Sequence, residues 1–262
     1  MSHTLSFGRL GHLLKNDIRQ KGKMILVVSP CVIIILTILL LFAGTKVLML
    51  GLDMPGIIHV PIFVTALLIG GSILASRSFK ELRNEREAGL LLTRPVSMLE
   101  MYVGRLVLTS LGYFLGLVVI YGLAVMCAAG LDHAVFGKNL LWFPDLNVSM
   151  LYGIQAFFAV HSIFMVGALY FKRGAFWKTL LVAFLFCLGV ILFAVAALSS
   201  LNLIFDVGPN IMRVMKFDLA LFTTETSHAS YIFRLPMQSV LHTIIAPICW
   251  IIGYYRLADT EV

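Results

Sequence analysis

The chain has 262 residues, of which 60% are hydrophobic and 13% are charged, whereas a soluble domain is nearer half apolar and a quarter charged. A soluble fold of this length cannot cover so much apolar surface with so few charges, so the composition excludes an ordinary soluble protein. The net charge of +7 is compatible with nucleic-acid binding, but the basic residues stand in short clusters between apolar runs. That placement is typical of membrane proteins, and we expect no nucleic-acid partner.

The first 23 residues are basic and amphipathic. Lys15 and Arg19 lie off a helical face that four apolar residues form: Phe7, Leu10, Leu14 and Ile18. This pattern predicts an N-terminal helix, within residues 1–23, that lies in the cytoplasmic interface of a membrane. The alternative is a basic tail that only orients the first membrane span.

Six apolar runs follow, each long enough to cross the hydrocarbon core of a bilayer, which takes about 20 residues. We expect helices, because an isolated strand cannot satisfy its backbone polar groups in lipid. The predicted fold is an all-α membrane protein that forms a single transmembrane domain over residues 1–262. The predicted spans are Met24–Ala43, Ile57–Ala75, Met101–Ala129, Met150–Phe171, Trp177–Ser199 and Gln238–Tyr255.

The loop between the second and third runs, residues 76–100, is dense in charges of both signs. Ser76 or Ser78 is placed to cap a short helix. Ser97 and Glu100 form a capping-box pattern at the start of the third run. A solvated, salt-bridged loop is the alternative, but the order of the caps favours a structured element docked at the membrane surface.

The stretch 200–237, before the last run, is too apolar for a flexible linker. A loop of this length without structure of its own is uncommon. We therefore expect short helices that partly re-enter the outer leaflet or cap the outer mouth of the protein.

Lysine and arginine predict the orientation of the spans. With the N-terminus in the cytoplasm, 15 of the 20 basic residues fall in inner segments, which matches the positive-inside rule. Both termini are therefore expected in the cytoplasm, together with the loop after the second run. The basic residues on the outer side are Lys46, Lys138, Arg213, Lys216 and Arg234.

Sequence motifs for chemistry are absent. There is no G-x-x-x-x-G-K-[ST] phosphate loop, no H-E-x-x-H zinc motif and no C-x-x-C pair, so we predict no catalytic, metal-binding or cofactor-binding residue in this chain. His161 and His242 fall within predicted spans, where a histidine either serves a proton relay or a ligand, or hydrogen-bonds a neighbouring helix. Gly112 and Gly116 form a G-x-x-x-G pair that permits close approach of helices.

A recognisable order of residues runs from the charged loop into the third run. It consists of Glu85, Gly89, Pro95, Ser97, Gly104 and Arg105. This order resembles a motif of the membrane subunits of ABC type 2 transporters, and it departs from that motif at Leu90, where the family has Ser or Thr. The plan of the whole chain is also similar to that family: a basic amphipathic start, six spans and a long outer segment before the last span.

The resemblance implies a permease subunit of an ATP-driven exporter in the bacterial inner membrane, which is not itself an enzyme. Its partners would be a separate ATPase subunit, which holds ATP and Mg²⁺, and a second permease half, identical or paralogous. In that family a short cytoplasmic helix, here about Ser78–Ala88, docks in a cleft of the ATPase, and the next inner loop makes a smaller contact. The implied ATPase interface is Phe79, Lys80, Leu82, Arg83, Glu85, Arg86, Glu87, Arg173 and Phe176.

A secondary transporter or channel that is not coupled to ATP is the alternative function. Such a protein would carry charged or broken helices at mid-membrane, whereas every Asp and Glu falls in a predicted loop or at the end of a predicted span. A membrane enzyme would need convergent polar side chains in the spans. The sequence leaves the transported substrate open.

Overall fold

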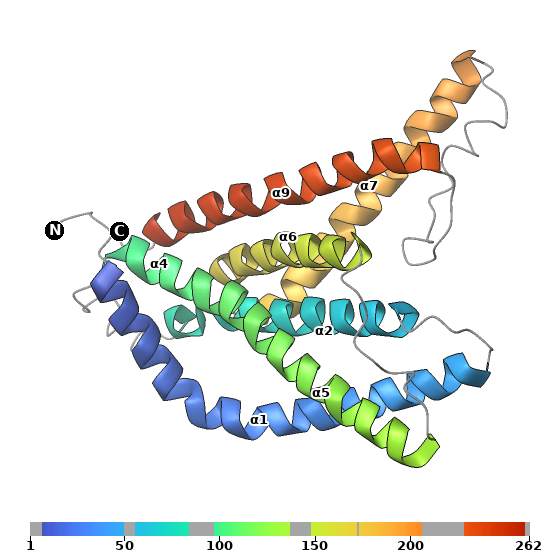
Figure 1. Ribbon diagram of the computed structural model, residues 1–262. Helices are drawn as coiled ribbons and strands as arrows, with labels where there is room; N and C mark the ends of the chain where they lie inside the picture. Colours follow the sequence, from blue (N-terminus) through green and yellow to red (C-terminus); the bar gives the residue numbers. More distant parts are fainter. Residues whose placement is uncertain are drawn as a thin grey trace.

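The computed structural model describes residues 7–49, 56–83, 97–136, 148–171, 173–205 and 228–259, and within these ranges it is almost entirely helical, with no strand (Figure 1). The all-α prediction is thereby confirmed for this part of the chain. The elements are α1 (Phe7–Met49), α2 (Gly56–Arg77), the 3-10 helix η1 (Lys80–Arg83), α4 (Met98–Val107), the π-helical turn η2 (Leu108–Gly112), α5 (Tyr113–Phe136), α6 (Val148–Tyr170), α7 (Ala175–Phe205) and α9 (His228–Ala258).

Within the described part of the chain, four helical stretches are long and apolar enough to cross a membrane, and they correspond to the second to fifth predicted spans. They are His59–Arg77, Met98–Ala134, Ser149–Tyr170 and Ala175–Ala197. The first and last predicted spans contain shorter apolar helical segments, Val28–Gly44 within α1 and Thr243–Ala258 within α9. These lengths and compositions indicate a helical membrane protein.

The N-terminal segment is not a separate helix. α1 continues without a break for 43 residues, with Pro30 inside it. At 1.5 Å per residue it is roughly 65 Å long, about twice the thickness of the hydrocarbon core. Figure 1 shows that α1 changes direction along its length. Only part of α1 can therefore cross a bilayer, and the interfacial position of its first part stays a prediction.

The prediction of separate short helices in the outer segment, residues 200–237, is wrong at both ends of that segment. α7 continues past Ser199 to Phe205, and α9 already begins at His228 rather than at Gln238. The middle of the segment, residues 206–227, lies outside the described part of the chain.

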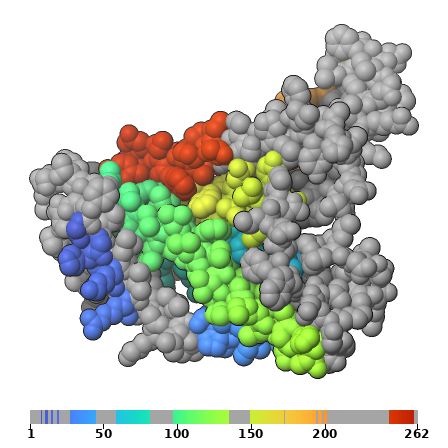
Figure 2. All heavy atoms as spheres, viewed as in Figure 1, coloured from blue at the N-terminus to red at the C-terminus, as the bar shows by residue number. Residues whose placement is uncertain are grey.

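Two clusters of buried apolar side chains hold the helices together. The first joins α1, α2, α5 and α6 and contains Leu36, Leu40, Val60, Phe63, Val64, Leu67, Leu117, Tyr121, Ala124, Val125, Ala128 and Phe157. The second joins the end of α2 to α4, α6 and α9 and contains Ala75, Phe79, Tyr102, Phe164, Met165, Ala168 and Leu257. In the space-filling view of Figure 2, α4, α6 and α9 lie against one another on the face shown.

Glycines mark the closest helix contacts, though not those of the G-x-x-x-G pair. A Cβ atom on Gly71 of α2 would overlap the ring of Phe157 in α6, and one on Gly167 of α6 would lie 2.8 Å from the Cβ of Thr179 in α7. By contrast, Gly116 has no neighbour within 4 Å, and Gly112 is near only its own helix. Small residues let helix backbones approach in lipid, and here α2, α6 and α7 use that device.

Candidate functional site

α2 ends in a tight turn that contains the first part of the predicted ATPase interface. The Ser78 backbone N–H and hydroxyl both donate to the Ala75 carbonyl, at 3.1 and 2.6 Å. The Ser76 hydroxyl donates to the Ser72 carbonyl at 2.8 Å. These serine hydroxyls bind carbonyls of the helix that ends here. In its described part the short helix expected over Ser78–Ala88 begins at Lys80 and is a single 3-10 turn, Lys80–Arg83. Residues 84–88 lie outside the described part of the chain.

Phe79 packs inside the chain. Its side chain is 1% exposed, and its ring stacks on Tyr102 of α4 with 6.1 Å between centroids and 13° between planes. The Arg105 guanidinium carbon lies 5.8 Å from the centre of the same ring, in a cation–π arrangement. The sequence placed Phe79 in the interface with a partner subunit. In the structure its ring is instead buried within the chain, where it holds the turn on α4.

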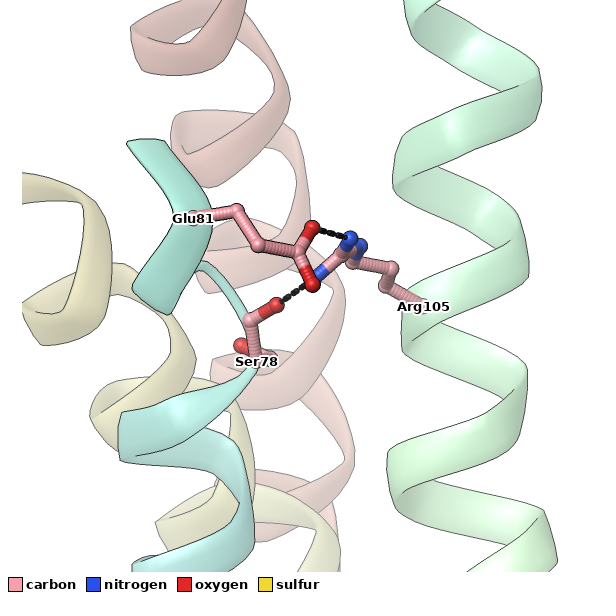
Figure 3. Close-up of polar contacts among 3 residues, drawn as sticks. All are labelled: Ser78, Glu81 and Arg105. Carbon is pink, nitrogen blue, oxygen red and sulfur yellow. Dashed lines mark hydrogen bonds and ion pairs between the residues drawn. The ribbon is translucent and has the colours of Figure 1, made fainter. Parts of the chain in front are cut away.

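Arg105 fixes the turn from the polar side, as Figure 3 shows. Its guanidinium donates to the Ser78 backbone carbonyl and to the Glu81 carboxylate. The side chain of Arg105 is only 11% exposed, whereas that of Glu81 is 40% exposed. The planar fork of a guanidinium suits two acceptors held at a fixed angle. We call the group Ser78, Phe79, Glu81, Tyr102 and Arg105 the junction.

Tyr102 extends the junction to α9. Its hydroxyl donates to the Trp250 carbonyl at 2.8 Å, and its ring meets that of Tyr254 edge to face at 6.0 Å.

The predicted capping box is confirmed at the start of α4. The Glu100 N–H donates to the Ser97 hydroxyl at 3.2 Å, and the Ser97 N–H donates to the Glu100 carboxylate at 3.1 Å. α4 is thus fixed both at its start and along the side that faces the turn.

The structure describes only some of the other residues of the predicted ATPase interface. Lys80 is exposed on η1. Leu82 and Arg83 belong to the backbone of η1, but their side chains are not described. The predicted residues outside the described ranges are Glu85, Arg86 and Glu87.

The second predicted contact, between α6 and α7, reaches the same apolar cluster as Phe79. Arg173 is exposed beside Gly174, whose φ of 65° lies in the left-handed region that glycine adopts readily. Phe176 is half-buried, with its ring 5.4 Å from that of Phe164, and it packs against the cluster that buries Phe79. The chain thereby connects its two predicted contact segments through one packed core.

A hydrogen-bonded series leads from the junction into the membrane. The Thr109 hydroxyl, in the π turn, donates to the Arg105 carbonyl at 2.7 Å. The same hydroxyl oxygen lies at hydrogen-bond distance, 3.2 Å, from Nε2 of the fully buried His161 in α6. The other ring nitrogen, Nδ1, has no hydrogen-bond partner within the described residues. For His161 this arrangement favours the helix-bridging alternative; the His242 side chain is not described.

A third membrane histidine, His59, was overlooked in the sequence. It is 1% exposed in α2, and its Nδ1 lies 2.9 Å from the Tyr121 hydroxyl of α5. The available signal was its position inside the predicted second span. Buried polar side chains in a membrane need a partner, and this pair joins two helices at the opposite end of α2 from the junction.

The contacts of the junction connect the turn after α2 to α4 and, through Tyr102, to α9. No group of three or more His, Cys, Asp or Glu side chains that could hold a metal ion occurs in the described ranges. Comparison with known proteins finds no matching family, no matching curated protein and no matching solved structure.

Proposed function

We propose that this chain is the transmembrane permease subunit of an ATP-driven ABC exporter and is coupled to a separate ATPase subunit. The observation that carries the proposal is the junction, a short charged turn that is tied to two further helices at the end of a span. Phe79 and Arg105 tie the turn to α4, and Tyr102 ties α4 to α9. The resemblance of residues 85–105 to the ABC type 2 motif supports the same function.

The junction would transmit movement from the partner into the membrane. A displacement of η1 would be passed to Arg105, because the Arg105 guanidinium binds both the Ser78 carbonyl and Glu81. Since Tyr102 lies three residues before Arg105 on α4 and binds the Trp250 carbonyl, α9 would move with α4. ATP and Mg²⁺ would bind to the partner, and two permease halves, identical or paralogous, would form the substrate pathway as a dimer.

The outward surface for the ATPase would consist of the exposed charges around this turn. Lys80 on η1 and Arg173 before α7 are both exposed. Together with the predicted charges at Glu85, Arg86 and Glu87, they would set the orientation and rate of association, because rim charges act mainly in those ways. Phe79 would contribute indirectly, by holding the turn in shape.

The test is co-purification with the ABC ATPase that we expect the neighbouring reading frame to encode. We expect the wild-type complex to survive purification and Lys80→Glu with Arg173→Glu to lose most of the ATPase, because two repulsive contacts would replace two attractive ones. The control is Lys15→Glu with Arg19→Glu, an equal charge change at exposed positions of α1, which should retain the partner. Retention by both double variants would contradict the predicted interface.

Transport in sealed vesicles distinguishes the two functions. An exporter requires ATP on the cytoplasmic side and loses transport when the ATPase is inactive. A secondary transporter or channel works without ATP. Cysteine labelling from outside gives the orientation: a Cys at Asp145 should react and one at Asn84 should not.

A further inference from the structure

Two consecutive aromatic residues at the end of α6 each carry a cation from a different helix. The Arg256 guanidinium carbon, from α9, lies 5.0 Å from the centre of the Tyr170 ring. The Lys178 ammonium, from the first turn of α7, lies 5.9 Å from the centre of the Phe171 ring. Three helices thus bring two positive charges to one corner of the molecule.

Neither cation is neutralised within the described part of the chain. The ion pair formed there joins Arg105 to Glu81, and it involves neither Lys178 nor Arg256. Asp259, one turn after Arg256, is exposed and also forms no ion pair in the same ranges. A cation over an aromatic face keeps its charge, so among the described residues the corner presents two cations that are in no ion pair.

The corner lies where three apolar helical stretches end together. Ser149–Tyr170 ends at it, Ala175–Ala197 starts beside it, and Thr243–Ala258 contains Arg256 near its C-terminal end. Trp177 is 71% exposed and Tyr255 is 64% exposed. Exposed Trp and Tyr at the ends of membrane helices typically lie at the level of lipid headgroups.

A long apolar surface begins directly after Lys178. From Leu180 to Val195 every residue of α7 whose burial is described is exposed, except the half-buried Ala183. Figure 1 shows α7 diverging from the bundle toward its C-terminal end. A molecule bound at the corner would therefore have its charged part beside two cations and its apolar part along α7.

We infer that the corner formed by Tyr170, Lys178 and Arg256 binds an anionic phospholipid. Its phosphate lies beside Lys178 and Arg256, Trp177 lies at the level of its glycerol backbone, and its acyl chains lie along α7. This inference is independent of the proposed coupling to an ATPase, since it uses none of the junction residues.

A lipid fits this surface better than a second copy of the chain does. A protein packed over this corner would bury two cations that have no carboxylate partner among the described residues, and burial of unpaired charge is strongly unfavourable. An anionic headgroup neutralises the same cations while they stay in the hydrated interface. Each basic residue near a membrane surface contributes roughly a fivefold preference for an anionic lipid over a neutral one.

The exposed Trp177 provides the test. In a variant with Trp142→Phe and Trp250→Phe it is the remaining one of the three tryptophans. This protein is reconstituted into phosphatidylcholine vesicles that contain brominated phosphatidylglycerol or, separately, brominated phosphatidylcholine, since bromine quenches nearby tryptophan fluorescence. We expect the anionic lipid to give half-quenching at a mole fraction at least roughly fivefold lower. Monodisperse elution checks that each variant is folded.

Two double variants make the test specific. Lys178→Gln with Arg256→Gln should make the two brominated lipids equivalent. Lys15→Gln with Arg19→Gln removes the same charge from exposed positions of α1 and should keep the preference. The inference is overturned if the parent protein shows no preference, if the preference survives in the first double variant, or if it is lost equally in both. It is also overturned if neither lipid quenches Trp177, because a second copy then covers α7.

Discussion

The junction and α7 contain similar side chains in opposite surroundings. Phe79 at the junction is 1% exposed, whereas Phe186 in the middle of α7 is 71% exposed. Half of the most apolar stretch of α6 is buried, but none of the corresponding stretch of α7 is. Apolar content therefore indicates that a helix can enter lipid, and it does not indicate whether that helix packs against protein.

The packed helices have small and hydroxyl-bearing residues at their contacts, whereas the middle of α7 has no such contacts among the described residues. Gly71 and Ser72 of α2 are buried against neighbouring helices, and Gly153 of α6 lies against the side chain of Val64 in α2. Gly189, in the middle of α7, has nothing within 4 Å. Since lipid is as apolar as leucine, helix association in a membrane depends on close packing and hydrogen bonds. Matched substitutions at the two regions can test this difference.

The largest difference is expected for the two phenylalanines. Phe79→Ala should lower the free energy of unfolding by about 3 kcal/mol, because it removes a buried ring and leaves a cavity beside Tyr102. Phe186→Ala should change it by less than about 0.5 kcal/mol, since the exposed ring loses few protein contacts. Unfolding by dodecyl sulfate in mixed micelles measures both. Equal losses would mean that α7 is packed in the intact protein.

A second pair concerns the glycines. Gly71→Ala should lower the free energy of unfolding by about 2 kcal/mol. The new Cβ atom would overlap the buried ring of Phe157, which other rings hold in place. Gly189→Ala should be neutral or slightly stabilising, because alanine favours the helix and meets no neighbour. The same micelle titration applies. A destabilising Gly189→Ala would indicate a helix contact at the middle of α7.

The smallest expected difference concerns the tyrosines. Tyr102→Phe should cost about 1 kcal/mol, because it deletes the hydrogen bond to the Trp250 carbonyl and leaves the ring in place. Tyr255→Phe removes a hydroxyl from a side chain that is 64% exposed and should have no measurable effect on stability. If the proposed coupling is right, Tyr102→Phe should also reduce ATP-dependent transport without releasing the ATPase. Unchanged transport would limit Tyr102 to a structural role.

Local features of this protein were predictable from the sequence, and contacts between distant segments were not. Four spans follow from composition, and the capping box of Ser97 and Glu100 follows from a pattern of four adjacent residues. The inward position of Phe79 depends on the packing of the turn after α2 against α4, where Tyr102 lies 23 positions further along the chain. No periodicity in a charged loop indicates such a contact.

The contact between α6 and α7 was equally unpredictable from the sequence. Both helices are apolar on all sides, so their sequences predict spans of the same kind. Gly167 and Thr179 determine where the two helices touch, but a single glycine in a span is common. For the same reason the G-x-x-x-G pair at Gly112 and Gly116 indicated a contact that the described structure does not contain.

The π turn has a consequence for the direction in which every later side chain of its helix points. In an unbroken α-helix Tyr102 and Tyr113, eleven positions apart, would point within about 20° of each other, at 100° per residue. A turn closed by i→i+5 bonds takes up one extra residue, which leaves the two side chains about 80° apart. Tyr102 accordingly reaches α9, whereas the Tyr113 hydroxyl donates to the Ala66 carbonyl of α2 at 2.8 Å. One additional residue between positions 108 and 112 thus changes the phase of the helix and lets a single long span serve two different neighbours.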